Sequence, residues 1–302
     1  MSKLLYVRDH EGFACLTVET HRNRWFAAHI VLTKDCGCLK LLNERDLEFY
    51  KFLFTFLAMA EKLVNFNIDE LVTSFESHDI DHYYTEQKAM ENVHGETYAN
   101  ILNMLFDGDR AAMNAYAEAI MADEALQAKI SWLRDKVAAA VTLPEKILVF
   151  LLIEGIFFIS SFYSIALLRV RGLMPGICMA NNYISRDELL HTRAASLLYN
   201  SMTAKADRPR ATWIQELFRT AVEVETAFIE ARGEGVTLVD VRAIKQFLEA
   251  TADRILGDIG QAPLYGTPPP KDCPLTYMTS IKQTNFFEQE SSDYTMLVVD
   301  DL

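Results

Sequence analysis

The sequence predicts an all-α protein, and three observations support this. Gly and Pro are scarce, with 12 and 8 among 302 residues, so few positions interrupt regular backbone structure. Long stretches repeat their apolar residues at the 3.6-residue period of a helix, and no strand-rich or low-complexity tract appears. Three prolines stand together in TPPPKD, and the character of the sequence changes from about Gln261 onward. We therefore expect long packed helices followed by a non-helical C-terminal segment.

The first half of the chain contains three helical patterns. Asn43 is a candidate N-cap, because its side chain can accept a hydrogen bond from a free N–H group of the first turn. The helix after it is expected over residues 44–66, and a second covers residues 81–106. The Ala-rich residues 109–141 are expected to form two shorter helices.

The second half begins with Pro144, which suits the first turn of a helix because that position needs no N–H donor. This helix contains the apolar run Ile147–Leu168, and the sequence GLMPG breaks the chain after it. Further helices are expected over residues 177–202, 212–231 and 237–256.

The run Ile147–Leu168 is long enough to cross a membrane, but it carries a charge, Glu154, and three serines. A carboxylate at the centre of a span costs about 2.5–3.5 kcal/mol on insertion scales. We therefore expect no membrane span, and predict a helix buried on all sides within a bundle. Such a helix still needs a partner for the buried carboxylate.

Charge and cysteine content limit the function and the compartment. The net charge of −13 argues against nucleic-acid binding, which needs clustered Lys and Arg. The cysteines are odd in number and show no CxxC spacing, which favours free thiols in a reducing compartment. The start, MSKLLYVRDHEGF, lacks the apolar stretch of a secretory signal, so a cytoplasmic protein is expected.

Two Glu-x-x-His pairs, Glu91/His94 and Glu188/His191, lie within long helical patterns. Chance predicts about half a match of this template in the chain, so the pairs alone are weak evidence. Their context strengthens them, because residues at i and i+3 project from one face of a helix.

A four-helix bundle can hold two metal ions with one Glu from each of two helices and Glu-x-x-His from each of the other two. Glu61 and Glu154 supply the lone carboxylates, and one of them precedes each pair along the chain. Four carboxylates balance two divalent cations, and oxygen ligands with two imidazoles favour iron or manganese over zinc. The alternative makes Glu154 a protonated or salt-bridged core residue and the pairs surface features.

An aromatic group lies beside the predicted metal ligands. Tyr98 follows His94 by four residues and shares its helical face. Phe158, Phe162 and Ile184 are spaced to form an apolar wall on the same side, although core packing explains those three equally well.

The motifs MENVHGETY, EGIFFISSF, RGLMPG and ISRDELLH together resemble the small, radical-generating subunit of class I ribonucleotide reductase. The compact length and the ending YTMLVVDDL resemble the herpesvirus members, and gammaherpesviruses in particular. The resemblance implies a ferritin-like fold, a homodimer, and a complex with a large subunit that holds the substrate site. It also implies a di-iron centre that uses dioxygen to oxidise Tyr98 to a stable radical, with manganese the less favoured metal.

The resemblance also assigns roles to residues. The implied metal ligands are Glu61, Glu91, His94, Glu154, Glu188 and His191, and the implied radical pocket is Phe158, Phe162 and Ile184. Asp187 and Trp25 match the pair that connects the iron-bound His to the surface, and Tyr294 matches the tail tyrosine that relays the radical. The family usually has Asp at the position of Glu61, which leaves the binding mode of this ligand open.

The expected organisation is an N-terminal segment packing on the bundle (1–40), a ferritin-like helical domain (41–262), and a Pro-rich segment with a docking tail (263–302). The predicted function is generation of the radical for reduction of ribonucleoside diphosphates. A ferritin-like ferroxidase or a two-electron oxidase shares the bundle and the six ligands, but neither needs Tyr98 in its pocket.

Overall fold

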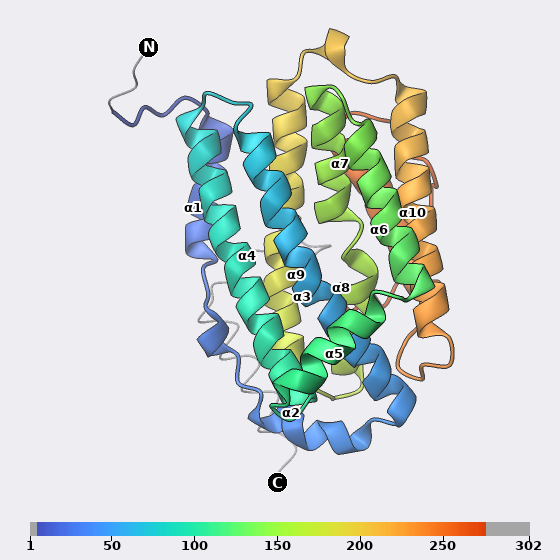
Figure 1. Cartoon of the computed structure of the whole chain (residues 1–302). Coiled ribbons are helices and arrows are strands. Elements are labelled where there is room, and N and C mark those ends of the chain that lie inside the picture. Colours follow the sequence, from blue (N-terminus) through green and yellow to red (C-terminus); the bar gives the residue numbers. More distant parts are fainter. Residues whose placement is uncertain (1–4, 276–302) are drawn as a thin grey trace.

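The computed structural model describes residues 5–275, except for the side chains of residues 62–67 and 70. Every regular element in the described part of the chain is a helix (Figure 1). The all-α prediction is confirmed. The α-helices are α1 Glu11–Arg22, α2 Thr33–Cys38, α3 Glu44–Val72, α4 His78–Leu105, α5 Arg110–Ile120, α6 Glu124–Ala139, α7 Leu143–Gly155, α8 Ile159–Val170, α9 Pro175–Met202, α10 Ala211–Gly233 and α11 Val241–Asp258. Short 3-10 turns lie at Ala27–His29, Leu39–Leu41 and Lys205–Asp207.

Four helical columns form the central bundle: α3, α4, α9, and α7 continued by α8. Helix α3 packs along α4, α9 packs along both α7 and α8, and α4·α9 and α3·α7 contacts close the bundle. Helix α1 covers α4 and α9 on one side, while α10 lies against α6 and α11 on the other (Figure 1). The interior is one apolar cluster that includes residues from all four columns.

Side-chain caps define several helix starts. The Asn43 side chain accepts a hydrogen bond from Asp46 N at 2.9 Å, which confirms the predicted N-cap of α3. That helix continues to Val72, beyond the predicted end at residue 66. Asp123 caps α6 through Leu126 N, so the Ala-rich segment divides into two helices as predicted.

The prediction of one continuous helix over Ile147–Leu168 is wrong. Helix α7 ends at Gly155 and α8 begins at Ile159, with three turn residues between them. A tertiary contact supports the break, because Lys129 Nζ donates a hydrogen bond of 2.6 Å to the Phe157 carbonyl. By length and composition the stretch Leu143–Val170 passes as a membrane span, but all of its most apolar window is buried inside the bundle.

The GLMPG break positions the start of α9. Met174 adopts a left-handed conformation with φ of 52°, and Pro175 begins the helix. Asp35 then accepts hydrogen bonds from Gly176 N (3.0 Å) and Ile177 N (2.8 Å). The short helix α2 thereby supplies the carboxylate at the N-terminus of α9, where the helix dipole favours negative charge.

Candidate metal centre

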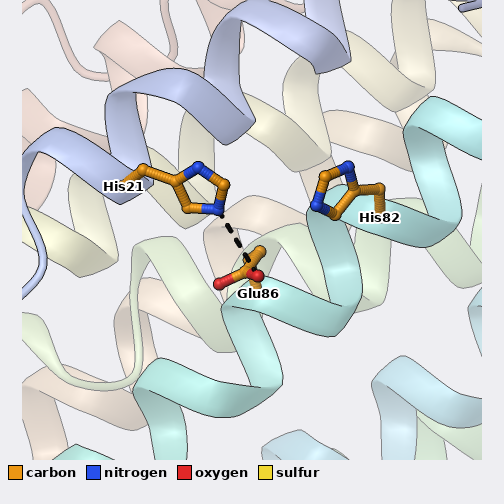
Figure 2. Close-up of side chains that lie close together, drawn as sticks. All are labelled: His21, His82 and Glu86. Atoms are coloured by element: carbon orange, nitrogen blue, oxygen red, sulfur yellow. Dashed lines mark ion pairs between the residues drawn. The ribbon is translucent and has the colours of Figure 1, made fainter.

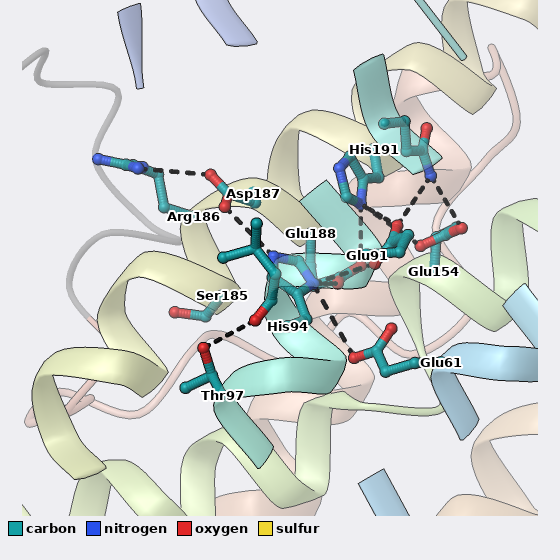
Figure 3. Close-up of polar contacts among 12 residues, drawn as sticks. Glu61, Glu91, His94, Thr97, Glu154, Ser185, Arg186, Asp187, Glu188 and His191 are labelled. Carbon is teal, nitrogen blue, oxygen red and sulfur yellow. Dashed lines mark hydrogen bonds and ion pairs between the residues drawn. The ribbon is translucent and has the colours of Figure 1, made fainter. Parts of the chain in front are cut away.

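The six predicted ligands converge inside the bundle, and at most 5 % of any of them is exposed (Figure 3). Helix α3 supplies one carboxylate, α7 supplies another, and α4 and α9 each supply a Glu-x-x-His pair. Helical periodicity explains the pairs, because i and i+3 lie one turn apart on the same face. The residues are Glu61, Glu91, His94, Glu154, Glu188 and His191.

These side chains form two overlapping groups, and within each group the possible ligand atoms all lie within 4.8 Å of one another. The first group is Glu61, Glu91, His94 and Glu188; the second is Glu91, Glu154, Glu188 and His191. Glu91 and Glu188 belong to both. Two ions at this site would therefore share two carboxylates, and each would have one further carboxylate and one imidazole.

Each imidazole turns its Nδ1 atom toward three carboxylates. His94 Nδ1 lies 3.0 Å from Glu91 Oε2, 3.2 Å from Glu188 Oε1 and 3.9 Å from Glu61 Oε1. His191 Nδ1 lies 3.0 Å from Glu91 Oε1, 3.3 Å from Glu188 Oε2 and 3.8 Å from Glu154 Oε2. The two halves of the site are therefore nearly equivalent in their donor atoms.

Several buried polar atoms of the cluster make no well-formed hydrogen bond among the described residues, although some of them take part in the imidazole–carboxylate contacts above. They are Glu61 Oε2, Glu91 Oε2, Glu154 Oε2 and His94 Nδ1. Buried polar atoms are normally hydrogen-bonded, so atoms of this kind in a cluster of hard donors fit a metal-ligating role. Four carboxylates and two imidazoles also balance two divalent cations. The residues therefore fit a di-metal centre.

The charges in the cluster are strongly perturbed. Burial, with repulsion from Glu91, raises the pKa of Glu61, and burial, with repulsion from Glu188, raises the pKa of Glu154. Burial alone would raise the pKa of Glu91 as well, but His191 and His94 hold it below its usual value. Burial would lower the pKa of both histidines, and the surrounding carboxylates instead raise it. A perturbed cluster of this kind is typical of a functional site.

Gln87 also contacts the cluster of predicted ligands, and the sequence analysis did not identify it. Its Nε2 atom donates to Glu154 Oε1 at 3.1 Å and to Glu91 Oε1 at 3.3 Å, so it orients one carboxylate from each of two helices. The signal in the sequence is its spacing of four residues from Glu91 on the same helical face.

Asp187 links the cluster to Trp25. His94 Nε2 lies 3.3 Å from Asp187 Oδ2, and Trp25 Nε1 donates to the same oxygen at 2.7 Å. The indole also stacks on the His94 ring, with centroids 6.0 Å apart. Burial would raise the pKa of Asp187, but Arg186 and His94 hold it low, so the carboxylate stays charged. A carboxylate behind a ligating imidazole fixes the orientation of that ring.

Tyr98 lies in the core beside the cluster, with 2 % exposure and no hydrogen-bond partner for its hydroxyl among the described residues. Burial, followed by the negative charge of Glu61, raises the pKa of Tyr98, so the phenol stays protonated. The Tyr98 ring contacts the Phe54 ring, with 6.2 Å between their centroids. Sequence reasoning missed Phe54, although it precedes Glu61 by seven residues on the same face of α3.

The other predicted pocket residues are also buried. Phe158 and Phe162 pack ring against ring, with centroids 6.1 Å apart, and Ile184 is 1 % exposed. Asn181 Nδ2 donates to the Phe162 carbonyl at 3.0 Å. The predicted tail residue Tyr294 lies outside the described residues.

A second group of possible ligands, His21, His82 and Glu86, lies between α1 and α4 (Figure 2). His21 Nε2 is 3.4 Å from Glu86 Oε1, and the His21 side chain is 47 % exposed. Arg24 already forms an ion pair with Glu86. The group is therefore a weaker candidate than the buried one.

Residues 4–274 match the family model described as "Ribonucleotide reductase, small chain". The chain belongs to this family. It is 62 % identical over 302 residues to the ribonucleoside-diphosphate reductase small subunit of Equine herpesvirus 2, covering 100 % of this chain and 99 % of the relative. Over the same shares, the corresponding subunits of Saimiriine herpesvirus 2 and Human herpesvirus 8 are 60 % and 57 % identical. The predicted likeness to small subunits of gammaherpesviruses is confirmed.

Solved structures of ribonucleotide reductase small chains share the fold. The Rnr4 homodimer from Saccharomyces cerevisiae has a TM-score of 0.77 at 21 % identity, covering 97 % of this chain and 89 % of that chain. Dimanganese(II)-NrdF from Streptococcus sanguinis has a TM-score of 0.80 at 18 % identity, covering 91 % and 97 %. The predicted ferritin-like helical fold is confirmed.

Proposed function

We propose that this ribonucleotide reductase small chain holds two iron ions at the six clustered residues and carries a stable radical on Tyr98. The observation that supports this most directly is the pair of overlapping ligand groups sharing Glu91 and Glu188, with the Tyr98 hydroxyl buried beside them. When bound, the iron pair supplies activation of dioxygen and one-electron oxidation of the phenol.

The protein's own residues prepare this chemistry in three ways. Glu91 and Glu188 belong to both ligand groups and would help to hold both ions, and Gln87 limits rotation of the Glu154 and Glu91 carboxylates. The apolar core around Tyr98 excludes water, which would otherwise quench a radical. Loss of an electron from Tyr98 would also release its hydroxyl proton, and the acidic groups whose charge acts on this phenol are Glu61, Glu188 and Glu91.

Trp25, Asp187 and His94 form a buried hydrogen-bonded path from the metal ligands toward α1. We propose that this path carries the radical between the centre and a large subunit, with Tyr294 as a further relay. The family and the subunit names of the relatives support a partner subunit, and the yeast homodimer supports a dimer. Docking through residues 263–302 and a location in the host cytoplasm belong to the same proposal.

The choice of iron over manganese is also a proposal. Carboxylates with imidazoles suit either metal, and the Streptococcus sanguinis structure is a dimanganese protein. Anaerobic loading with each metal, followed by oxygen and an activity assay with the large subunit, distinguishes them. Activity with manganese alone would contradict the iron assignment.

The decisive test of the radical is Tyr98→Phe. The variant should bind as much iron as the wild type, but give no tyrosyl signal by electron paramagnetic resonance and no nucleotide reduction. The matched control is Tyr84→Phe, because Tyr84 lies on the same helix, is fully buried, and also has a hydroxyl without a hydrogen-bond partner among the described residues. It should keep the signal. A tyrosyl signal that survives Tyr98→Phe would remove the radical from Tyr98, whereas a wild-type protein that oxidises iron without any tyrosyl signal would favour a ferroxidase or oxidase function for this centre.

The tail assignment is tested by deleting residues 294–302. The truncated protein should keep its metal content and its Tyr98 radical but lose turnover with the large subunit. Full turnover after the deletion would remove both the docking role of the tail and the relay role of Tyr294.

A further inference from the structure

A buried ion pair, Lys129–Glu225, lies outside the six-residue cluster. Lys129 Nζ is 2.7 Å from Glu225 Oε2, and the two side chains are 1 % and 0 % exposed. Helix α6 contributes the lysine and α10 contributes the glutamate. The proposed chemistry uses neither residue.

The pair binds both the break between α7 and α8 and the start of α8. Within the break, Lys129 Nζ donates to the Phe157 carbonyl at 2.6 Å. In the first turn of α8, Ser160 Oγ donates to Glu225 Oε1. One ion pair therefore connects the break to the first turn of α8. Only Gly155 separates Glu154 from the break, and Phe158 lies within it.

The stability of the folded protein does not by itself require the charged pair Lys129–Glu225 at this buried position. The ammonium group sits over the rings of Phe56 and Phe228, 4.2 and 4.4 Å from their centroids. Burial lowers the pKa of Lys129 and raises that of Glu225, because both charges have lost their water. Well-packed apolar residues at such sites are often equally stable or more so. What apolar residues cannot supply is a donor to the Phe157 carbonyl and an acceptor for Ser160.

We propose that Lys129 and Glu225 are positioning residues that hold the α7–α8 break and thereby aim Glu154 at the metal centre and Phe158 at the core beside Tyr98. An uninterrupted helix would rotate every residue after Gly155 relative to Glu154, because the break replaces regular i→i−4 bonding with an Ile159 N to Ile156 O bond of 3.1 Å. The inference rests on the proposed di-metal function, and it concerns the ligand group that contains Glu154.

The test uses Co²⁺ alone, titrated anaerobically into the metal-free full-length chain and followed by its absorption bands. The double variant Lys129→Met/Glu225→Leu removes both charges and the donor to Phe157. We expect one of the two ions to bind about 10–100-fold more weakly, the usual effect of losing support behind a ligand. The other ion should bind as in the wild type. Backbone amides of residues 156–161 should also exchange their hydrogens faster.

Two further variants serve as controls. Lys129→Arg keeps the charge and the donors, so it should keep most of the wild-type affinity. Glu223→Gln removes an exposed carboxylate from the same helix α10 and should change nothing. A folded double variant with wild-type Co²⁺ binding and wild-type exchange would overturn the inference, whereas a wild-type chain that fails to bind two ions would overturn the proposed function itself.

If the double variant does not fold, Ser160→Ala provides the test. This substitution removes the hydroxyl that donates to Glu225 and leaves the Lys129–Glu225 ion pair in place. It should weaken the same ion several-fold; unaltered binding in this variant would overturn the inference.

Discussion

Gly155 lies at the end of α7, directly after Glu154, and has little room for a side chain. A Cβ atom there would lie 2.6 Å from Ile255 Cδ1 and 3.1 Å from Thr192 Cγ2. Thr192 cannot turn away freely, because its hydroxyl donates to the Glu188 carbonyl at 2.8 Å. The flexible end of Ile255 must therefore move, inside a core where it is 0 % exposed. Gly155→Ala should destabilise the protein.

The magnitude follows from two opposing effects. Overpacking a buried site costs about 1–3 kcal/mol. Ala is favoured over Gly inside a helix by about 1 kcal/mol, but Gly155 is the last residue of α7 and gains only part of this. The net loss is about 1–2 kcal/mol. With an unfolding entropy of about 0.6 kcal/mol per kelvin for this chain length, Tm should fall by about 2–3 °C.

Thermal unfolding of the metal-free protein, with a chelator present, measures this change without the contribution of bound ions. The control is Ile255→Val, which removes the clashing Cδ1 and costs about 0.5–1.5 kcal/mol alone. In the double variant one methyl group is added and one removed, so the volume is conserved. It should be no less stable than Ile255→Val alone. The steric argument would be refuted if the stability losses of the two single variants simply added up in the double variant. An unchanged Tm for Gly155→Ala would refute it as well.

Two further predictions concern other buried contacts. Burial would raise the pKa of Asp79, but the Tyr6 hydroxyl and the N–H groups of His10 and Asp9 lower it. Its stabilising effect should therefore be complete above the unfolded pKa, near 3.9, and decline as the pH falls through the lower folded value. The stability gap between wild type and Asp79→Asn, measured by thermal unfolding, should be constant from pH 5 to 7 and narrow below about pH 4; a gap that widens there would contradict the sign. Trp25→Phe removes the indole donor to Asp187 and should cost about 1–3 kcal/mol in chemical unfolding. On the proposed function it should also keep the Tyr98 radical and lose turnover, and wild-type turnover would exclude Trp25 from the path.

Much of the site was predictable because its signals are local. Helical periodicity places Glu91 with His94, and Glu188 with His191, on single faces, whatever the rest of the fold does. The isolated charge of Glu154 in an apolar run requires compensation wherever that run is buried. The capping role of Asn43 and the division of residues 109–141 likewise depend on short-range chemistry. These features could be read directly from the residues.

Only the tertiary structure decided how the helix faces that carry these residues come together. The break between α7 and α8 has no local signal strong enough to predict it, and the hydrogen bond that accompanies it, from Lys129 Nζ to the Phe157 carbonyl, comes from another helix. Gln87 joins Glu91 to Glu154 only because α4 and α7 lie within hydrogen-bond reach. For the contact of Trp25 with Asp187, family resemblance supplied the expectation and the packing of the N-terminal segment on the bundle supplied the geometry. Periodicity specifies which side chains share a helical face, whereas only long-range packing specifies which faces come together and at what distance.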